Sequence, residues 1–263
     1  ADSVNWGINY PGRNNVAWMW KANGSGSSNE DGSINTNKTS ANTTAGFSVI
    51  EWSGTGANGT IGHGLGIQPS LYIVKNTATT NSWMVGSTLY ANTKFLILNA
   101  TDALDTSAAV WNSAYPTSSV INLGSNAGSN GSGTNNMICY AFAEIPGYSS
   151  FGSYTGNGST NGPFVYTGFK PAFVILKRTN ATQEWQMYDT QRDPYNVTNH
   201  KLEPNSSNAE STSTSDNELD FLSNGFKLRE DNGGMNASGS TYIYMAFSEH
   251  SFGGDGVAPA TAR

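Results

Sequence analysis

The feature that most constrains the fold of this chain is a long internal duplication. Four segments recur in the same order: residues 52–56 (WSGTG) as 154–158 (YTGNG), 66–75 (GIQPSLYIVK) as 168–177 (GFKPAFVILK), Trp83 as Trp185, and 140–144 (YAFAE) as 245–249 (MAFSE). The first three recur 102 residues later and the fourth 105 residues later, so three residues were gained between them, as surface loops tolerate. One folding unit therefore occurs twice in tandem.

Both copies contain short apolar runs that are typical of β-strands. Residues 71–74 and 173–176 each lie between a proline and a lysine, which favours strands covered on both faces. Asn224-Gly225 separates two apolar runs and predicts a hairpin, because this pair accepts the positive φ of a tight turn. No apolar period of 3.6 residues persists for three turns. We therefore expect an all-β chain of two tandem antiparallel, jelly-roll-like β-sandwiches.

The duplication divides the chain into four parts. Residues 46–146 and 147–252 form the two sandwiches. Residues 1–45 are expected to be the end of a preceding domain plus a linker arm, with 16–21 as the last strand of that domain and 22–45 loosely packed. The chain opens without methionine, so an N-terminal portion is expected to be missing. Residues 253–263 form a flexible tail that extends from the last strand or docks on a neighbouring subunit.

Charge and composition exclude several classes of function. Only 12% of the residues are charged, the net charge is −6 and no basic cluster occurs, so nucleic-acid binding is not expected. The apolar runs are only as long as strands, so membrane insertion is not expected. Cys139, the single cysteine, lies in an apolar strand pattern and is expected to be buried. A surface rich in Asn, Ser, Thr and Gly suits hydrogen bonding to sugars.

Longer motifs resemble a module of structural proteins from marine bacteriophages. They are residues 31–34 (DGSI), 40–48 (SANTTAGFS), 62–66 (GHGLG), 151–158 (FGSYTGNG), 162–169 (GPFVYTGF) and 221–228 (FLSNGFKL). This module, to which no biochemical activity is assigned, occurs toward the C-terminal end of tail-fibre or spike-like proteins. The resemblance implies a virion protein on the extracellular particle, homo-oligomeric and in particular trimeric. It also implies contact with other virion proteins and a role in attachment to the host.

The candidate binding residues are aromatic rings beside polar side chains on expected loops, a combination that suits stacking on sugars. They are Trp111, Tyr115, Asp189, Arg192, Asp193, Tyr195 and Asn196. The expected ligand is a host-surface glycan or another outer-membrane component. For Tyr115 and Tyr195, packing between subunits is an equal alternative. Trp83 and Trp185 recur at one offset and are expected to share a core position instead.

A glycan-cleaving enzyme is the main catalytic alternative, since it needs two carboxylates across a cleft. Asp189 and Asp193 are the best pair, followed by Glu218 and Asp220, and the first copy has no acids at the position of the first pair. Asp-Pro is also an ordinary turn, and Arg192 is available to pair with either acid. We therefore predict that the chain is not an enzyme. A purely structural role, such as decorating a capsid, is the other alternative to attachment.

No cofactor is expected. The loop around His63 lacks the helix that a phosphate-binding loop requires, so a turn with a partly exposed histidine is expected, with Val165 as its counterpart. His63, His200 and His250 are scattered and predict no zinc site. Residues 29–32 (NEDG) and 230–233 (EDNG) offer oxygen ligands on turns, which makes Ca²⁺ a weak possibility without the spacing of a known calcium loop. No metal ligand is assigned.

Overall fold

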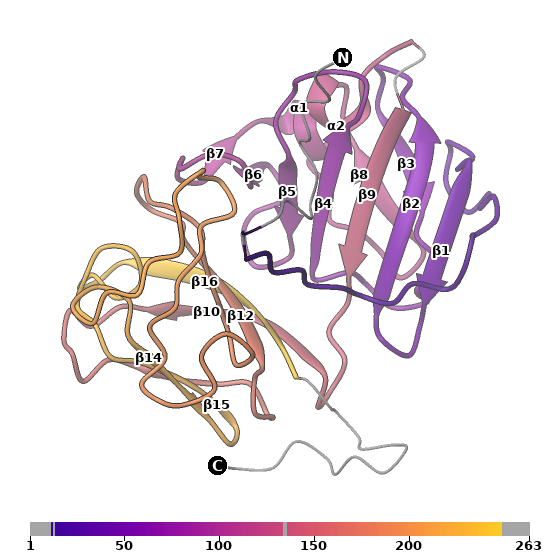
Figure 1. The fold of residues 1–263 in the computed structure, drawn as a ribbon. Helices are drawn as coiled ribbons and strands as arrows, with labels where there is room; N and C mark the ends of the chain where they lie inside the picture. Colours follow the sequence, from indigo (N-terminus) through magenta and orange to yellow (C-terminus); the bar gives the residue numbers. More distant parts are fainter. Residues whose placement is uncertain (1–11, 13, 134–135, 249–263) are drawn as a thin grey trace, which may run out of the picture.

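The all-β class is confirmed by the computed structural model, which describes residues 12, 14–133 and 136–248 (Figure 1). The strands are β1 (Lys38–Asn42), β2 (Phe47–Ser53), β3 (Gly59–Gly62), β4 (Leu71–Asn76), β5 (Met84–Ser87), β6 (Lys94–Ile97), β7 (Asp105–Thr106), β8 (Val120–Leu123), β9 (Asn136–Phe142), β10 (Ser149–Thr155), β11 (Phe164–Tyr166), β12 (Phe173–Arg178), β13 (Gln186–Asp189), β14 (Leu219–Leu222), β15 (Gly225–Leu228) and β16 (Thr241–Phe247). Two one-turn helices, α1 (Ala108–Trp111) and α2 (Ala127–Asn130), lie between β7 and β9. Within the described residues, no helix has the length and apolar content that crossing a membrane requires.

The main sheet of each copy has the same strand order. The first main sheet runs β1-β2-β9-β4-β5-β6-β7 and the second β10-β16-β12-β13, so the second repeats the β2-β9-β4-β5 part of the first. The register also repeats: Leu71 lies opposite Phe142, and Phe173, 102 residues after Leu71, lies opposite Phe247, 105 residues after Phe142. Residues that correspond in the sequence repeat therefore also occupy corresponding places in the strand pairing.

A smaller sheet covers one face of each main sheet and completes a sandwich. In the first copy it consists of β3 and β8, with Ile61 opposite Ile121. In the second copy it runs β11-β15-β14, with Val165 opposite Phe226, and β14 and β15 form the predicted hairpin around Asn224-Gly225. The inner faces of the two sandwiches enclose one apolar core each.

A third core joins the two copies, because the main sheets are apolar on both faces. In β4, Tyr72 and Val74 enter the core of the first sandwich, whereas Leu71 packs with residues of the second copy. Phe173 of β12 does the same from the other side. The continuous apolar runs in the sequence thus reflect strands covered on both faces, and the copies lie against each other as Figure 1 shows.

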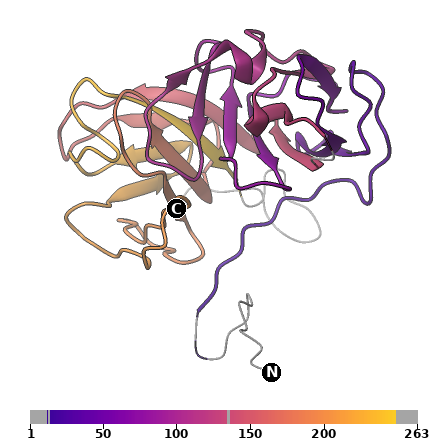
Figure 2. The same cartoon turned by 90° about the horizontal axis from the view of Figure 1, so that it is seen from above.

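Residues 27–42 of the N-terminal arm are hydrogen-bonded to one another and to the first copy, so the expectation of a loose linker is wrong there. β1 adds to the edge of the first main sheet, and Ile34 bridges to Ile61 of β3. Nor do residues 16–21 form a strand: the arm crosses the junction of the copies in the view of Figure 1, and Figure 2 shows that it lies on the outside of both copies. There the ring of Trp20 lies 5.9 Å from that of Phe142 and 5.3 Å from that of Phe247. One aromatic side chain therefore contacts both copies.

A buried asparagine explains the repeated WSGTG and YTGNG motifs. In the first copy, Asn130 Oδ1 accepts hydrogen bonds from Trp52 Nε1 and the Thr55 amide, both at 3.1 Å. In the second copy, Asn236 Oδ1 accepts from the Asn157 amide at 2.8 Å. The first glycine of each motif lets the backbone pass close by: a Cβ at Gly54 would lie 1.9 Å from a carbonyl oxygen. This buried amide was not among the sequence candidates.

The remaining expectations about buried residues have mixed outcomes. Cys139 is fully buried, as predicted, and burial raises the pKa of its thiol well above the usual range. Trp185 is buried in the core between the copies, whereas Trp83 is only half-buried and stacks on Tyr140 with ring centroids 6.4 Å apart. The shared core position is therefore correct for Trp185 alone. The tail, residues 253–263, lies outside the described residues.

Candidate functional site

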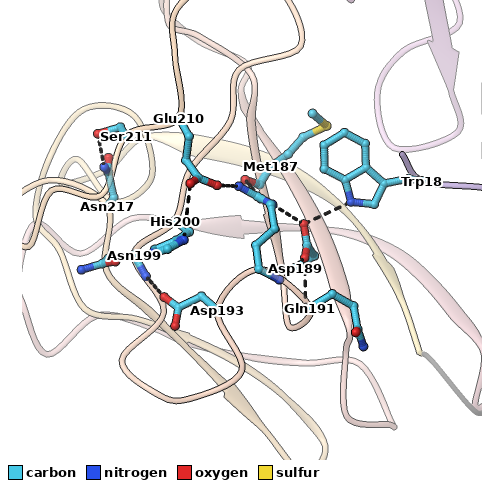
Figure 3. A network of polar contacts seen from close by, with 11 residues as sticks. Trp18, Met187, Asp189, Gln191, Asp193, Asn199, His200, Glu210, Ser211 and Asn217 are labelled. Carbon is cyan, nitrogen blue, oxygen red and sulfur yellow. Dashed lines mark hydrogen bonds and ion pairs between the residues drawn. The ribbon is translucent and has the colours of Figure 1, made fainter. Parts of the chain in front are cut away.

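The carboxylate of Asp189 ends β13 at the centre of a polar network (Figure 3). Oδ1 accepts hydrogen bonds from the amides of Gln191 and Arg192, at 3.1 and 2.9 Å. Oδ2 accepts from Trp18 Nε1 at 3.1 Å and from Arg192 Nε at 2.7 Å. In the first copy Ser87 holds this position, and its hydroxyl caps the amide two residues on in the same way. Asp189 thus closes a turn and fixes the arm.

Arg192 joins this carboxylate to a second acid. Its guanidinium pairs with both Asp189 and Glu210, and it lies 5.7 Å from the centre of the Trp18 ring. Nδ1 of His200 lies 3.5 Å from the other oxygen of Glu210. Of these residues, Trp18, His200 and Glu210 were not predicted as site residues. Trp18 lies 171 positions from Asp189, and His200 and Glu210 lie in a polar segment that carries no motif. The network is typical of a structural clamp.

The next residues of the loop border a shallow depression of about 220 Å³. It is lined by Lys170, Thr190, Asp193, Tyr195, Asn196 and Phe221 among others. The Asn196 amide group exchanges two hydrogen bonds with the backbone of Phe221, at 2.8 and 2.9 Å, and Asp193 accepts from the Asn199 amide at 2.9 Å. Tyr195, by contrast, is 77% exposed. A pinned loop therefore presents one free aromatic ring beside polar groups.

Trp111 and Tyr115 do not join this site, since they belong to the first copy. Trp111 was expected on an exposed loop, and that expectation is wrong: it ends α1, is buried, and packs edge-on against Tyr72 with ring centroids 4.7 Å apart. Its position in a one-turn helix between two sheets turns the ring inward. Tyr115 is 42% exposed, and its hydroxyl donates to the Tyr90 carbonyl at 3.1 Å.

The candidate acids are held by neighbours rather than by each other. Both oxygens of Asp189 are occupied as described above, and Asp220, the reserve candidate, pairs with Arg229. Burial, together with the nearby carboxylates of Glu218, Asp216 and Asp231, raises the pKa of Glu230. Over the part of the chain that the structure describes, no three His, Cys, Asp or Glu side chains are grouped to hold a metal ion.

His63 is fully buried, so the expected partial exposure is wrong. Its Nδ1 accepts from the Leu65 amide at 3.2 Å and its Nε2 lies 3.3 Å from the Thr117 carbonyl oxygen, which places the ring proton on Nε2. Burial lowers the pKa of His63. Strand pairing makes Thr167 its counterpart instead of Val165, because two residues were lost from the following loop.

Lys170 was also missed, although the repeat carries a signal for it. Residue 68 is glutamine in the first copy, where its side chain donates to the Pro116 carbonyl at 2.6 Å. The second copy has lysine at the corresponding place, beside the depression. Aligning the two copies and looking for positions where only the second has a charged residue would have identified Lys170.

Comparisons with known proteins give a family but no activity. No curated protein and no solved structure matches the chain. Residues 1–251 match a family model described as Domain of unknown function (DUF7483). The chain therefore belongs to the DUF7483 family.

Proposed function

We propose that this chain is a bacteriophage virion module of the tail-fibre or spike kind, and that its second copy contacts glycan on the host surface. The proposal of a virion protein rests on the resemblance of several motifs of the sequence to a module of marine bacteriophage structural proteins. It implies that the chain works on the extracellular particle, beside other virion proteins. The proposal of glycan contact rests on the loop at residues 193–196.

Tyr195 is the observation that carries the proposal of glycan contact. Its ring is 77% exposed, beside a depression lined by Lys170, Asp193 and Asn196. A sugar ring stacks on such an aromatic face while neighbouring polar groups bond its hydroxyls. The hydrogen bonds between Asn196 and Phe221 fix the loop in advance, which lowers the entropy that binding must overcome.

A single shallow site of this kind binds weakly, so we propose that several copies act together. A homotrimer would present three such loops on one particle and multiply the apparent affinity without any new contact. This is the oligomer that the resemblance implies. Light scattering on the purified full chain would show a mass three times that of the monomer, whereas a monomer would move the proposal toward a module that other virion proteins hold in place.

Binding to immobilised bacterial lipopolysaccharide and capsular polysaccharide tests the proposal. We expect the full chain to bind at least one preparation in a saturable way, and Tyr195→Ala to lower the affinity about tenfold, from the loss of a contact of ~1–1.5 kcal/mol. Tyr166→Ala is the matched control, because Tyr166 is another exposed tyrosine, at 66%, outside this loop. Equal effects of the two substitutions, or no binding to any preparation, would contradict glycan contact and favour a purely structural role.

The same preparations test the catalytic alternative. We propose that the chain does not cleave glycans, because the carboxylate of Asp189 is taken up by Trp18, Arg192 and two backbone amides. Release of reducing ends from a polysaccharide that the chain binds, and its loss in Asp189→Asn and Asp193→Asn, would establish a depolymerase instead. The absence of activity stays a prediction until that assay.

A further inference from the structure

An apolar cavity of about 610 Å³ lies at the junction of the two copies. Ile73 and Val85 of the first main sheet form one wall, and Ile175 and Met187 of the second main sheet form the other. These are corresponding positions, since Ile73 and Ile175, like Val85 and Met187, are 102 residues apart. The arm contributes a third side through Trp18, Met19 and Trp20. The same face of each copy thus borders one shared, half-open space.

Two of the polar groups in the cavity wall, the indole N–H groups of Trp18 and Trp185, have partners. Trp18 Nε1 donates to Asp189, and Trp185 Nε1 donates to the Ile97 carbonyl at 2.9 Å. Within the described residues, no charged side chain lines the cavity. The other polar side-chain groups of the wall are Trp20 Nε1 and the Tyr140 hydroxyl, and the remaining lining side chains are apolar. A buried water needs about two to four polar partners, so this wall suits an apolar molecule better than water. An apolar molecule gains from burial at such a site, by roughly 25 cal/mol per Å² of apolar surface.

The size and make-up of the cavity indicate the class of ligand. An apolar cavity of about 150 Å³ suffices for benzene, so one of about 610 Å³ accepts a much longer molecule. The space lies between two facing sheets, and three of its lining residues are methionines, whose flexible side chains adapt to a ligand without a fixed shape: Met19, Met187 and Met245. We propose that the cavity binds one unbranched aliphatic chain, such as that of a fatty acid, with its polar end toward solvent. This inference does not depend on the proposed glycan contact.

A titration of the full chain with cis-parinaric acid, a fluorescent unbranched fatty acid, tests the proposal. We expect saturable binding of one molecule per chain and displacement by hexadecanoic acid. Butanoic acid should not displace the probe over the same concentration range, because it buries too little apolar surface. No saturable binding, or equal displacement by the two acids, would overturn the proposal.

Two substitutions fill the cavity from different elements. Ile73→Trp acts from β4 and Leu98→Trp from the residue that follows β6, and both positions are half-buried, so a larger ring has room to turn into the cavity. Ile67→Trp is the matched control at a site 42% exposed and outside the cavity. We expect each filling variant that keeps the parent circular dichroism spectrum to weaken probe binding at least tenfold, and the control to leave it unchanged. Unchanged binding in a folded filling variant would place the probe elsewhere and overturn the proposal.

Discussion

Replacing Asn130, the buried asparagine of the first copy, tests whether its hydrogen bonds account for the repeated WSGTG motif. In Asn130→Ala, four hydrogen bonds are lost: those from Trp52 Nε1 and the Thr55 amide, and those to the Thr55 hydroxyl and the Ala57 carbonyl, at 2.9 and 2.7 Å. Thr55 and Ala57 are exposed, so water replaces most of their bonds. Trp52 is fully buried, and its indole N–H is left without a partner.

The expected loss of stability follows from this difference. An unpaired buried N–H costs ~1–3 kcal/mol, and an ordinary net hydrogen bond contributes about 1 kcal/mol. We therefore expect Asn130→Ala to lower the free energy of unfolding by about 2–4 kcal/mol, measured by guanidinium unfolding followed by circular dichroism. Asn58→Ala is the control, because Asn58 is exposed and should change stability by less than about 0.5 kcal/mol.

A double-mutant cycle isolates the indole contact. In a Trp52→Phe background no indole N–H remains, so Asn130→Ala should cost about 1–3 kcal/mol less than it does in the parent. A cost below about 1 kcal/mol in the parent, or no difference between the two backgrounds, would refute the reasoning. Asn236, the corresponding asparagine of the second copy, repeats the bonds to residues 157 and 159, but Tyr154, the counterpart of Trp52, donates to the Met235 carbonyl instead. Asn236→Ala leaves no indole N–H unpaired, so its cost should not depend on residue 154.

Three further predictions concern single side chains. Burial lowers the pKa of Lys177 to about 8, so the unfolded chain binds more protons than the folded chain between pH 8 and 10. The free energy of unfolding should therefore rise with pH over that window in the parent, and rise less in Lys177→Met. Chemical unfolding at several pH values would show this difference. Asp189→Ala should destabilise the chain by about 2–4 kcal/mol and make residues 14–23 easier to cut with protease. Asp189→Ser should restore the turn but not the bond to Trp18. Equal behaviour of the two variants would contradict the clamp. Cys139 should react with a thiol reagent only after denaturant is added, and rapid reaction in the native chain would contradict its burial.

The fold was predictable where the pattern is local or repeated. Apolar runs such as 71–74 and 173–176 fix the positions of β4 and β12, and Asn224-Gly225 fixes a hairpin, because strand and turn preferences act over a few residues. The constant offset between the repeats then predicted which strands of the two copies correspond. The sequence did not show which face of each strand points into the core of its own sandwich. A strand that is covered on both faces has apolar residues at every position, so apolar and polar residues do not alternate along it.

The site was predictable only in part, because its contacts join distant segments. Residues 189–196 were identified from composition, and Asp193, Tyr195 and Asn196 do border one depression. The partner of Asp189, however, is Trp18, 171 positions away, in an arm whose composition suggests a loose linker. The prediction that Trp111 lies on an exposed loop was wrong for a local reason. Its polar neighbours suggested a loop, but a single turn of helix carries the ring inward.

Differential scanning calorimetry of the full chain tests most directly whether the two copies and the arm form one structural unit. The copies share the core around Phe142, Phe173 and Phe247, and Trp20 contacts all three rings. Lys177 of the second copy also donates to the Thr101 carbonyl of the first, at 2.8 Å. We predict a single transition whose calorimetric and van't Hoff enthalpies agree. Two separate transitions would show that each copy folds and unfolds without the other, and would contradict the shared core.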